Sequence, residues 1–207
     1  MSDTDMTGAA RADFCRLLAA CFYQPDPAFA EERMFEAMAT AGASLGPTFE
    51  DDARALGEAF AHEDLQALLV DYTRLFIGPA GKLASPYASS WMGRDGASPA
   101  MPVLKLYGEA GFEVADNFRD LPDHVAAELE FLYLLIFRQA EAALDGDVDA
   151  LAKWEALERR FLREHLGTWV PPFAHALREG ATSRFYQRLA DLTERFVAAE
   201  RGSVAAG

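Results

Sequence analysis

Two stretches of the sequence carry residue types that could do chemistry. The first is G-P-A-G-K at residues 78–82, whose glycines and lysine suggest a phosphate-binding loop. A P-loop has the order G-x-x-x-x-G-K-[ST] between a strand and a helix. Here the glycines are only three apart, Leu83 stands where the magnesium-binding hydroxyl belongs, and no strand pattern precedes the loop. The stretch is therefore not a Walker-type site.

The second stretch is L-P-D-H-V-A-A-E-L-E-F at residues 121–131, where His124 and Glu128 are four apart. On a helix this spacing puts both side chains on one face, but two ligands fall short of a metal site. Di-iron bundles need paired E-x-x-H motifs, and no acidic residue stands three positions before any histidine. Motifs of hydrolases and metalloproteases are absent too. We therefore expect no metal, no cofactor and no catalytic residue, and a protein that is not an enzyme.

The rest of the chain must position these stretches, and it is almost entirely helical in pattern. Apolar residues recur at i, i+3, i+4 and i+7, and no alternating strand pattern has useful length. The expected helices are residues 14–22, 28–42, 49–76 in one piece or two joined near His62, 103–118, 120–146, 151–167, 170–177 and 185–196. The sequence predicts an all-α fold, a single-domain bundle of about eight to ten helices over residues 1–207.

The helix at 120–146 is the most informative of these. Asp120 can cap its N-terminus and Pro122 can occupy its first turn, where the missing N–H has no cost. Apolar residues surround the helix on all sides, which is typical of a central, buried helix. Gly146 is expected to end it.

Residues 77–100 interrupt the helical pattern with scattered glycines and prolines. Loops beyond about 12–15 residues are uncommon and are usually functional or disordered. Leu83, Tyr87, Trp91 and Met92 favour order, because disordered segments are poor in such residues. We expect an ordered hinge loop between an N-terminal helical part, about residues 9–76, and a C-terminal part, about residues 101–200. A hinge leaves both a monomer and a domain-swapped dimer open.

Charge and composition limit the partners. The net charge of −14 in 207 residues argues against nucleic acid and anionic membranes, and accepts a basic polypeptide. Cys15 and Cys21 are six apart, which does not suit an intrahelical disulfide, so both are expected as buried thiols in a reducing compartment. No signal-peptide pattern or apolar run of about 18 residues is present. These features predict a cytoplasmic protein without stable membrane insertion.

Three motifs, in order, resemble the TorD/DmsD/NarJ family of redox-enzyme maturation chaperones. The stretch Y-T-R-L-F-I-G-P at 72–79, followed by P-Y-A-S at 86–89, is similar to the family's Y/W-x-x-L-F-x-G-P and P-Y/W-x-S segments. P-D-H-V-A-A-E-L-E-F at 122–131 is similar to its P-D-H-x-x-x-E-L-x-F helix start. F-L-R-E-H-L-G-T-W-V-P-P-F at 161–173 is similar to its third recurring stretch. The resemblance covers about residues 10–200.

The resemblance implies a chaperone that binds the twin-arginine signal peptide and the apo-form of a molybdoenzyme before export. In the family, the hinge loop and the Asp-His pair are implicated in signal-peptide binding. A basic and then apolar leader suits aromatic anchors beside carboxylates that accept arginine. The candidate binding residues are Tyr72, Leu75, Phe76, Pro86, Tyr87, Ser89, Trp91, Pro122, Asp123, His124, Glu128 and Glu130.

Each kind of candidate also has a structural interpretation. Leu75 and Phe76 fit a core, and the loop aromatics could simply anchor the loop. Asp123 could cap the helix. His124 could bond Glu128, four residues on. Glu130 stands in an apolar helix and needs a partner if buried, such as Arg74 or Arg138.

The function also has alternatives. One is a NarJ-like scaffold that binds the mature subunit without recognising a twin-arginine leader. Another is a nucleotide hydrolase, against which the missing P-loop argues.

Overall fold

The computed structural model describes residues 3–78, 83–93, 101–112 and 120–206, with side chains from residue 8 to residue 203. In these ranges all regular elements are helical, apart from one isolated β-bridge. The α-helices are α1 (Asp3–Ala20), α2 (Ala28–Glu31), α3 (Met34–Leu45), α4 (Pro47–His62), α5 (Leu65–Tyr72), α6 (Met101–Ala110), α7 (Val125–Asp145), α8 (Val148–Phe161), α9 (Gly167–Gly180) and α10 (Arg184–Ala206). Three short turns complete the set: the π-turns η1 (Thr73–Ile77) and η3 (Leu162–Leu166), and the 3₁₀ turn η2 (Ala88–Ser90). The predicted all-α class is confirmed.

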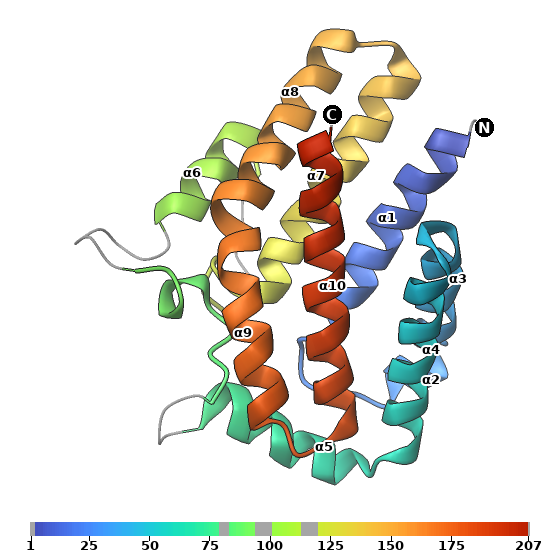
Figure 1. Cartoon of the computed structure of the whole chain (residues 1–207), viewed down its shortest axis with the longest axis vertical. Coiled ribbons are helices and arrows are strands. Elements are labelled where there is room, and N and C mark those ends of the chain that lie inside the picture. The colour runs from blue at the N-terminus through green and yellow to red at the C-terminus, as the bar shows by residue number, and fades with distance from the viewer. Residues whose placement is uncertain (1–2, 79–82, 94–100, 113–119, 207) are drawn as a thin grey trace.

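The helices form one bundle around a continuous core. Figure 1 shows α7, α8 and α10 running alongside one another, with α3 and α4 to one side, α6 to the other and α5 across one end. α1 packs against both α7 and α3, and α4 packs against α10. One apolar cluster includes residues from α1 through α10. Helices before and after the predicted hinge therefore share a single core.

The boundaries of the segment 49–76 follow the two-piece prediction, because α4 ends at His62 and α5 begins at Leu65. Other boundaries differ. The segment 28–42 is divided into α2 and α3 by Arg33, which adopts a left-handed conformation with φ 55°. The segment 103–118 ends at Ala110, before Gly111 with φ 65°. Its predicted continuation at residues 113–118 lies outside the described residues.

The junction of α8 and α9 also differs from the prediction of a break near Gly167. The π-turn η3 carries the chain from α8 into α9 without leaving the helix. Gly167 is required there, because a Cβ atom would collide with the carbonyl oxygen of Leu162. Pro171 has no N–H to bond the carbonyl of Gly167, and the Nη1 of Arg201 donates to that carbonyl at 3.2 Å instead. The prolines are therefore accommodated inside the helix.

The prediction of a central helix buried all round holds only for the start of α7, where the five consecutive residues 125–129 are all buried, and is wrong for the C-terminal half of the helix. Val125, Leu129 and Leu132 are in the core. Phe137, by contrast, is 41% exposed and Leu144 is 73% exposed. The start of the helix also differs: the N-cap is His124, and not Asp120.

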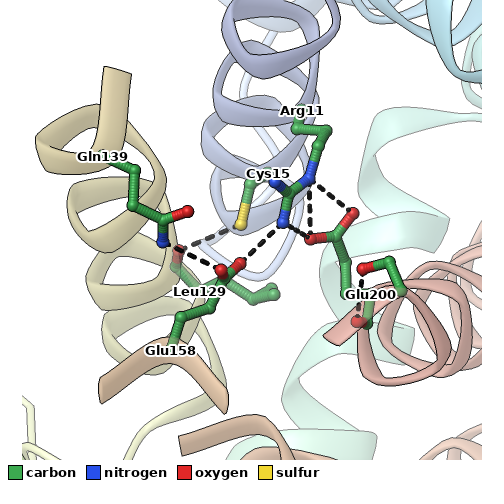
Figure 2. Close-up of polar contacts among 7 residues, drawn as sticks. Arg11, Cys15, Leu129, Gln139, Glu158 and Glu200 are labelled. Atoms are coloured by element: carbon green, nitrogen blue, oxygen red, sulfur yellow. Dashed lines mark hydrogen bonds and ion pairs between the residues drawn. The ribbon is translucent and has the colours of Figure 1, made fainter. Parts of the chain in front are cut away.

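A buried ionic cluster ties four of these helices together (Figure 2). Arg11 of α1 donates to Glu200 of α10, with an Nη2–Oε2 distance of 2.5 Å, and to Glu158 of α8, with an Nη2–Oε1 distance of 2.6 Å. Gln139 of α7 donates to the other oxygen of Glu158 at 2.8 Å. Burial raises the pKa of Glu200, against the opposing effect of Arg11. Arg11 lies 147 and 189 positions from its two partners in the sequence, so no local spacing pattern could predict these ion pairs.

Two further expectations concern the cysteines and the membrane. Cys15 and Cys21 are both free thiols and fully buried, as predicted. None of the helices in the described ranges combines the length and the apolar character needed to cross a bilayer.

Candidate functional site

The hinge loop and the start of α7 are joined by backbone pairing. Tyr87 and His124 form an isolated antiparallel bridge. The N–H of Ala88 donates to the carbonyl of Asp123 at 2.9 Å, and the N–H of Val125 donates to the carbonyl of Pro86 at 2.8 Å. The P-Y-x-S and P-D-H motifs therefore meet, although they are some 35 residues apart in the sequence.

Asp123 stabilises the junction between the hinge loop and the start of α7. Its side chain is buried, with 1% of the residue exposed. Oδ2 accepts a hydrogen bond from the N–H of Ser89 at 3.0 Å, whereas Oδ1 has no partner among the described residues. Asp123 thus fixes the loop onto α7 and does not cap the helix.

His124 performs the capping. Its Nδ1 accepts a hydrogen bond from the N–H of Ala126 at 3.1 Å, which places the proton of a neutral ring on Nε2. Nε2 faces Asp120 Oδ2 at 3.8 Å. The ring lies edge-on to Tyr87, with centroids 5.4 Å apart, and parallel to Tyr23 at 6.4 Å. The buried imidazole therefore packs against the rings of two tyrosines.

Glu128 lies on the inner face of α7 and is 0% exposed. It accepts a hydrogen bond from Trp169 Nε1 at 2.9 Å and pairs with His165 Nε2 at 2.8 Å. The predicted alternative, a bond between His124 and Glu128, is wrong. Burial raises the pKa of Glu128, while His165 and Trp169 oppose that shift. The second and third motifs are thus connected through the core.

A group of tyrosines and carboxylates covers the outer side of the junction. Tyr23 OH donates to Glu130 Oε1 at 2.7 Å, and Tyr87 OH donates to Asp120 Oδ1 at 2.5 Å. Burial and these carboxylates raise the pKa of both phenols, so they remain protonated donors. Burial and the charge of Asp120 also raise the pKa of Tyr72, which lies nearby. We call Tyr23, Tyr72, Tyr87, Asp120 and Glu130 the tyrosine–carboxylate patch.

The predicted arginine partners of Glu130 are wrong. Arg74 bonds Asp71 at 2.5 Å, and Arg138 bonds Glu141 at 2.7 Å. Glu130 is only partly buried, so it needs no buried cation, and a tyrosine is its observed partner.

The remaining candidates lie in or beneath the loop. Leu75, Phe76 and Pro86 are buried, and the first two belong to the core as their structural interpretation predicts. Trp91 is half-buried, donates from Nε1 to the carbonyl of Ser85 at 2.8 Å and contacts the ring of Phe173. The half-buried Pro122 accepts a hydrogen bond from Tyr107 OH at 2.9 Å.

An apolar stripe continues from the patch along α7. Glu130, Tyr133, Leu134 and Phe137 have the spacing i, i+3, i+4 and i+7, which places them on one helix face. Tyr133 and Leu134 are half-buried and Phe137 is exposed, with the two rings 6.1 Å apart. We call Tyr133, Leu134 and Phe137 the α7 stripe.

The α7 stripe and part of the patch were not predicted from the sequence, for different reasons. The α7 stripe has a visible signal, the helical spacing from Glu130. Tyr23 has none, because its partner lies 107 positions further along the chain. Within the described ranges no three His, Cys, Asp or Glu side chains come together as a metal site would require.

The geometry can be compared with known proteins. Residues 43–175 match the model of a family described as the nitrate reductase delta subunit. The chaperone protein TorD of Vibrio atlanticus is 30% identical over 72% of this chain and 70% of its own length. The chain belongs to this delta-subunit family.

One further relative and one solved structure are also similar to this chain. The selenate reductase assembly chaperone protein of Thauera selenatis is 31% identical over 66% of this chain and 70% of its own length. A crystal structure from Archaeoglobus fulgidus, described as a candidate redox enzyme maturation protein, shares the fold with a TM-score of 0.56 at 22% identity, covering 90% of this chain and 93% of that one.

The family match includes most elements of the site. It contains the hinge loop, α7 with its stripe, and the π-turn η3 that carries His165. Tyr23 of the patch lies before the matched residues. The Tyr23–Glu130 hydrogen bond therefore joins a residue outside the matched range to a residue of α7 inside it.

Proposed function

We propose that this chain is a cytoplasmic maturation chaperone, without catalytic activity, that binds the twin-arginine signal peptide and the apo-form of a molybdoenzyme before export. The names of its relatives, chaperone protein TorD and selenate reductase assembly chaperone, support the chaperone role. The binding of a leader peptide is our extension of that role to this chain.

One observation carries the extension: the tyrosine–carboxylate patch leads directly into the α7 stripe. A twin-arginine leader has a basic segment followed by an apolar one. Asp120 and Glu130 offer carboxylates, which form strong charge-assisted hydrogen bonds with guanidinium groups. The tyrosines of the patch and the exposed Phe137 supply the aromatic anchors on which peptide affinity depends. The order of charge and apolar surface on the protein thus matches the order in the peptide.

The predicted residues divide into two roles under this proposal. Surface contacts come from the half-buried candidates, which are Tyr72, Tyr87, Ser89, Trp91, Pro122 and Glu130. The buried candidates support that surface, and they are Leu75, Phe76, Pro86, Asp123, His124 and Glu128.

Calorimetric titration with a synthetic twin-arginine leader tests the proposal. Glu130→Gln keeps the shape of the side chain and removes its charge, so we expect affinity to fall about tenfold, the effect of roughly 1.4 kcal/mol. Glu155→Gln is the matched control, because Glu155 is exposed on α8. A leader with both arginines changed to glutamine should lose affinity for the wild type. Equal affinity of Glu130→Gln and wild type would reject the patch as the arginine site.

A second candidate function is a NarJ-like scaffold that binds the mature subunit and does not bind the leader; the name of one relative, a selenate reductase assembly chaperone protein, supports a role in assembly. This function predicts no heat with the leader at high micromolar concentration. It also predicts that binding to the full apo-subunit is retained. The two results together would replace leader binding by scaffolding.

A further inference from the structure

The turn between α7 and α8 exposes two large apolar side chains. Leu144 is 73% exposed and Val148 is 74% exposed, the highest values among the large apolar residues in the described ranges. Figure 1 shows this turn beyond the ends of α1 and α10, at the end of the bundle opposite α5. Single exposed apolar residues are normal, but an apolar group bordered by charges is typical of an interaction site. We call residues 144–149 the α7–α8 tip.

Hydrogen bonds on both sides of the turn fix the shape of the α7–α8 tip. Gly146 adopts a left-handed conformation with φ 69°. The N–H of Asp147 donates to the carbonyl of Ala142 at 3.0 Å, and that of Gly146 donates to the carbonyl of Ala143 at 3.3 Å. This pair of bonds is the Schellman motif. Asp147 then caps α8, because its Oδ1 accepts from the N–H of Ala150 at 2.9 Å. A surface that is ordered in advance loses less entropy on binding.

The α7–α8 tip is also acidic. It contains Asp145, Asp147 and Asp149, and no Lys or Arg occurs from residue 139 to residue 152. Asp145 and Asp149 have no ion pair within the described part of the chain. Asp145 is the last residue of α7, where the helix dipole disfavours a carboxylate and favours a cation. A cation from a partner would therefore stabilise this end of the helix.

We propose that the α7–α8 tip binds an apolar depression, bordered by Lys and Arg, on the folded part of the apo-subunit outside its leader. The proposed function supplies the identity of this partner. Leu144 and Val148 enter the depression, while Asp145 and Asp149 pair with the cations around it.

Other occupants suit the α7–α8 tip less well. An extended peptide needs a groove or a sheet edge, whereas the tip projects from the bundle. The carboxylates are repelled by an anionic membrane surface. A second copy of the chain carries the same net charge of −14 and is repelled as a whole. A basic surface on a folded protein remains as the complementary partner.

The position of the tip allows it to act together with the tyrosine–carboxylate patch. Leu144 lies 14 residues after Glu130 on α7, which is about 21 Å along the helix. The leader on the patch and the folded part of the subunit on the tip are therefore separate contacts with one client. Two linked contacts give a higher overall affinity than either contact alone.

The tip is tested with the apo-form of the molybdoenzyme catalytic subunit from the same organism, prepared without its leader, in calorimetric titration. Leu144→Gln should weaken binding at least tenfold. Leu104→Gln is the matched control, because Leu104 is 40% exposed on α6, and it should bind as the wild type does. Asp145→Asn should also weaken binding, while its melting temperature stays unchanged or rises because an unfavourable charge at the helix end is removed.

The leader peptide separates this inference from the proposed function. Leu144→Gln should bind the leader as the wild type does, and Glu130→Gln should bind the leaderless subunit as the wild type does. If the wild type bound no leader but bound the leaderless subunit through Leu144, the proposed leader site would be rejected and the tip would stand.

Three results would overturn the tip as a contact with the subunit. The first is that the wild type does not bind the leaderless subunit, or binds it no better than Leu144→Gln does. The second is an equal loss of binding in Leu104→Gln. The third is self-association of the wild type in analytical ultracentrifugation that Leu144→Gln abolishes, which would assign the tip to a second copy of the chain.

Discussion

The inner and outer faces of α7 use the same residue type for opposite purposes. Glu128 and Glu130 are two residues apart, so their side chains point about 200° apart around the helix. Glu128 is fully buried and bonds His165 and Trp169 from another segment. Glu130 is partly exposed and bonds one hydroxyl, that of Tyr23. Two carboxylates in neighbouring positions therefore face different surroundings.

This difference indicates that Glu128 stabilises the fold, whereas Glu130 is available to bind a partner. A buried carboxylate is stable only when its oxygens are bonded, and Glu128 has both oxygens in use. Among the described residues only Oε1 of Glu130 has a side-chain partner, which leaves Oε2 for a guanidinium group. The inner face should therefore control stability, and the outer face should control affinity.

The largest expected effect is on the inner face. Glu128→Ala removes one member of a buried pair and leaves His165 and Trp169 Nε1 unpaired, so we expect the free energy of unfolding to fall by about 3–5 kcal/mol. Urea denaturation followed by circular dichroism measures this. Glu155→Ala, on an exposed position, should change it by less than about 0.5 kcal/mol. A loss below about 1 kcal/mol for Glu128→Ala would remove the contrast between the two faces.

Sequence reasoning predicted the elements better than their contacts. Helical periodicity gave the fold class and most helices, since the pattern depends on neighbours three or four residues away. The partners of Glu128 lie 37 and 41 positions away, and that of Glu130 lies 107 away, and no local pattern encodes such distances. The start of α7 was misplaced for the same reason: Asp120 has good capping chemistry, but residues near 124 pair with the distant hinge loop.

The next largest effect is the pH dependence of stability, which tests the contrast between the two faces of α7. Burial raises the pKa of Glu128 above its ordinary value of 4.5. Its contribution to stability is therefore fully present below about pH 4.5 and is lost as the pH rises through the raised pKa. The difference in unfolding free energy between wild type and Glu128→Gln should accordingly decrease as the pH rises from 4 to 8.

Asp71 is an internal control, because its pKa is shifted in the opposite direction to that of Glu128. Its burial would raise its pKa, but hydrogen bonds from Ser183, Arg74 and Thr182 outweigh this and lower the pKa below 3.8. Asp71 thus stabilises the fold above about pH 3.8 and loses this effect as the pH falls. The difference between wild type and Asp71→Asn should therefore be smaller at pH 3 than at pH 6. The same trend in both variants would mean that overall charge, and not the individual sites, sets the pH dependence.

The smallest effect tests the outer face at the level of one hydroxyl. Tyr23 OH donates to Glu130 at 2.7 Å and so orients the carboxylate towards an incoming arginine. Tyr23→Phe keeps the ring and removes this hydrogen bond, which is typically worth about 0.5–1.5 kcal/mol. We expect the leader peptide to bind about two- to tenfold more weakly in calorimetry, and the melting temperature to fall by only about 2–4 °C.

Glu155→Gln is the control, because Glu155 is exposed on α8 and lies outside both the patch and the α7 stripe. It should bind the leader as the wild type does. If Tyr23 acts through Glu130, combining Tyr23→Phe with Glu130→Gln should cost little more than Glu130→Gln alone, because coupled residues are not additive. Additive losses would mean that Tyr23 contacts the peptide by itself, and the patch would then be two separate contacts on the outer face.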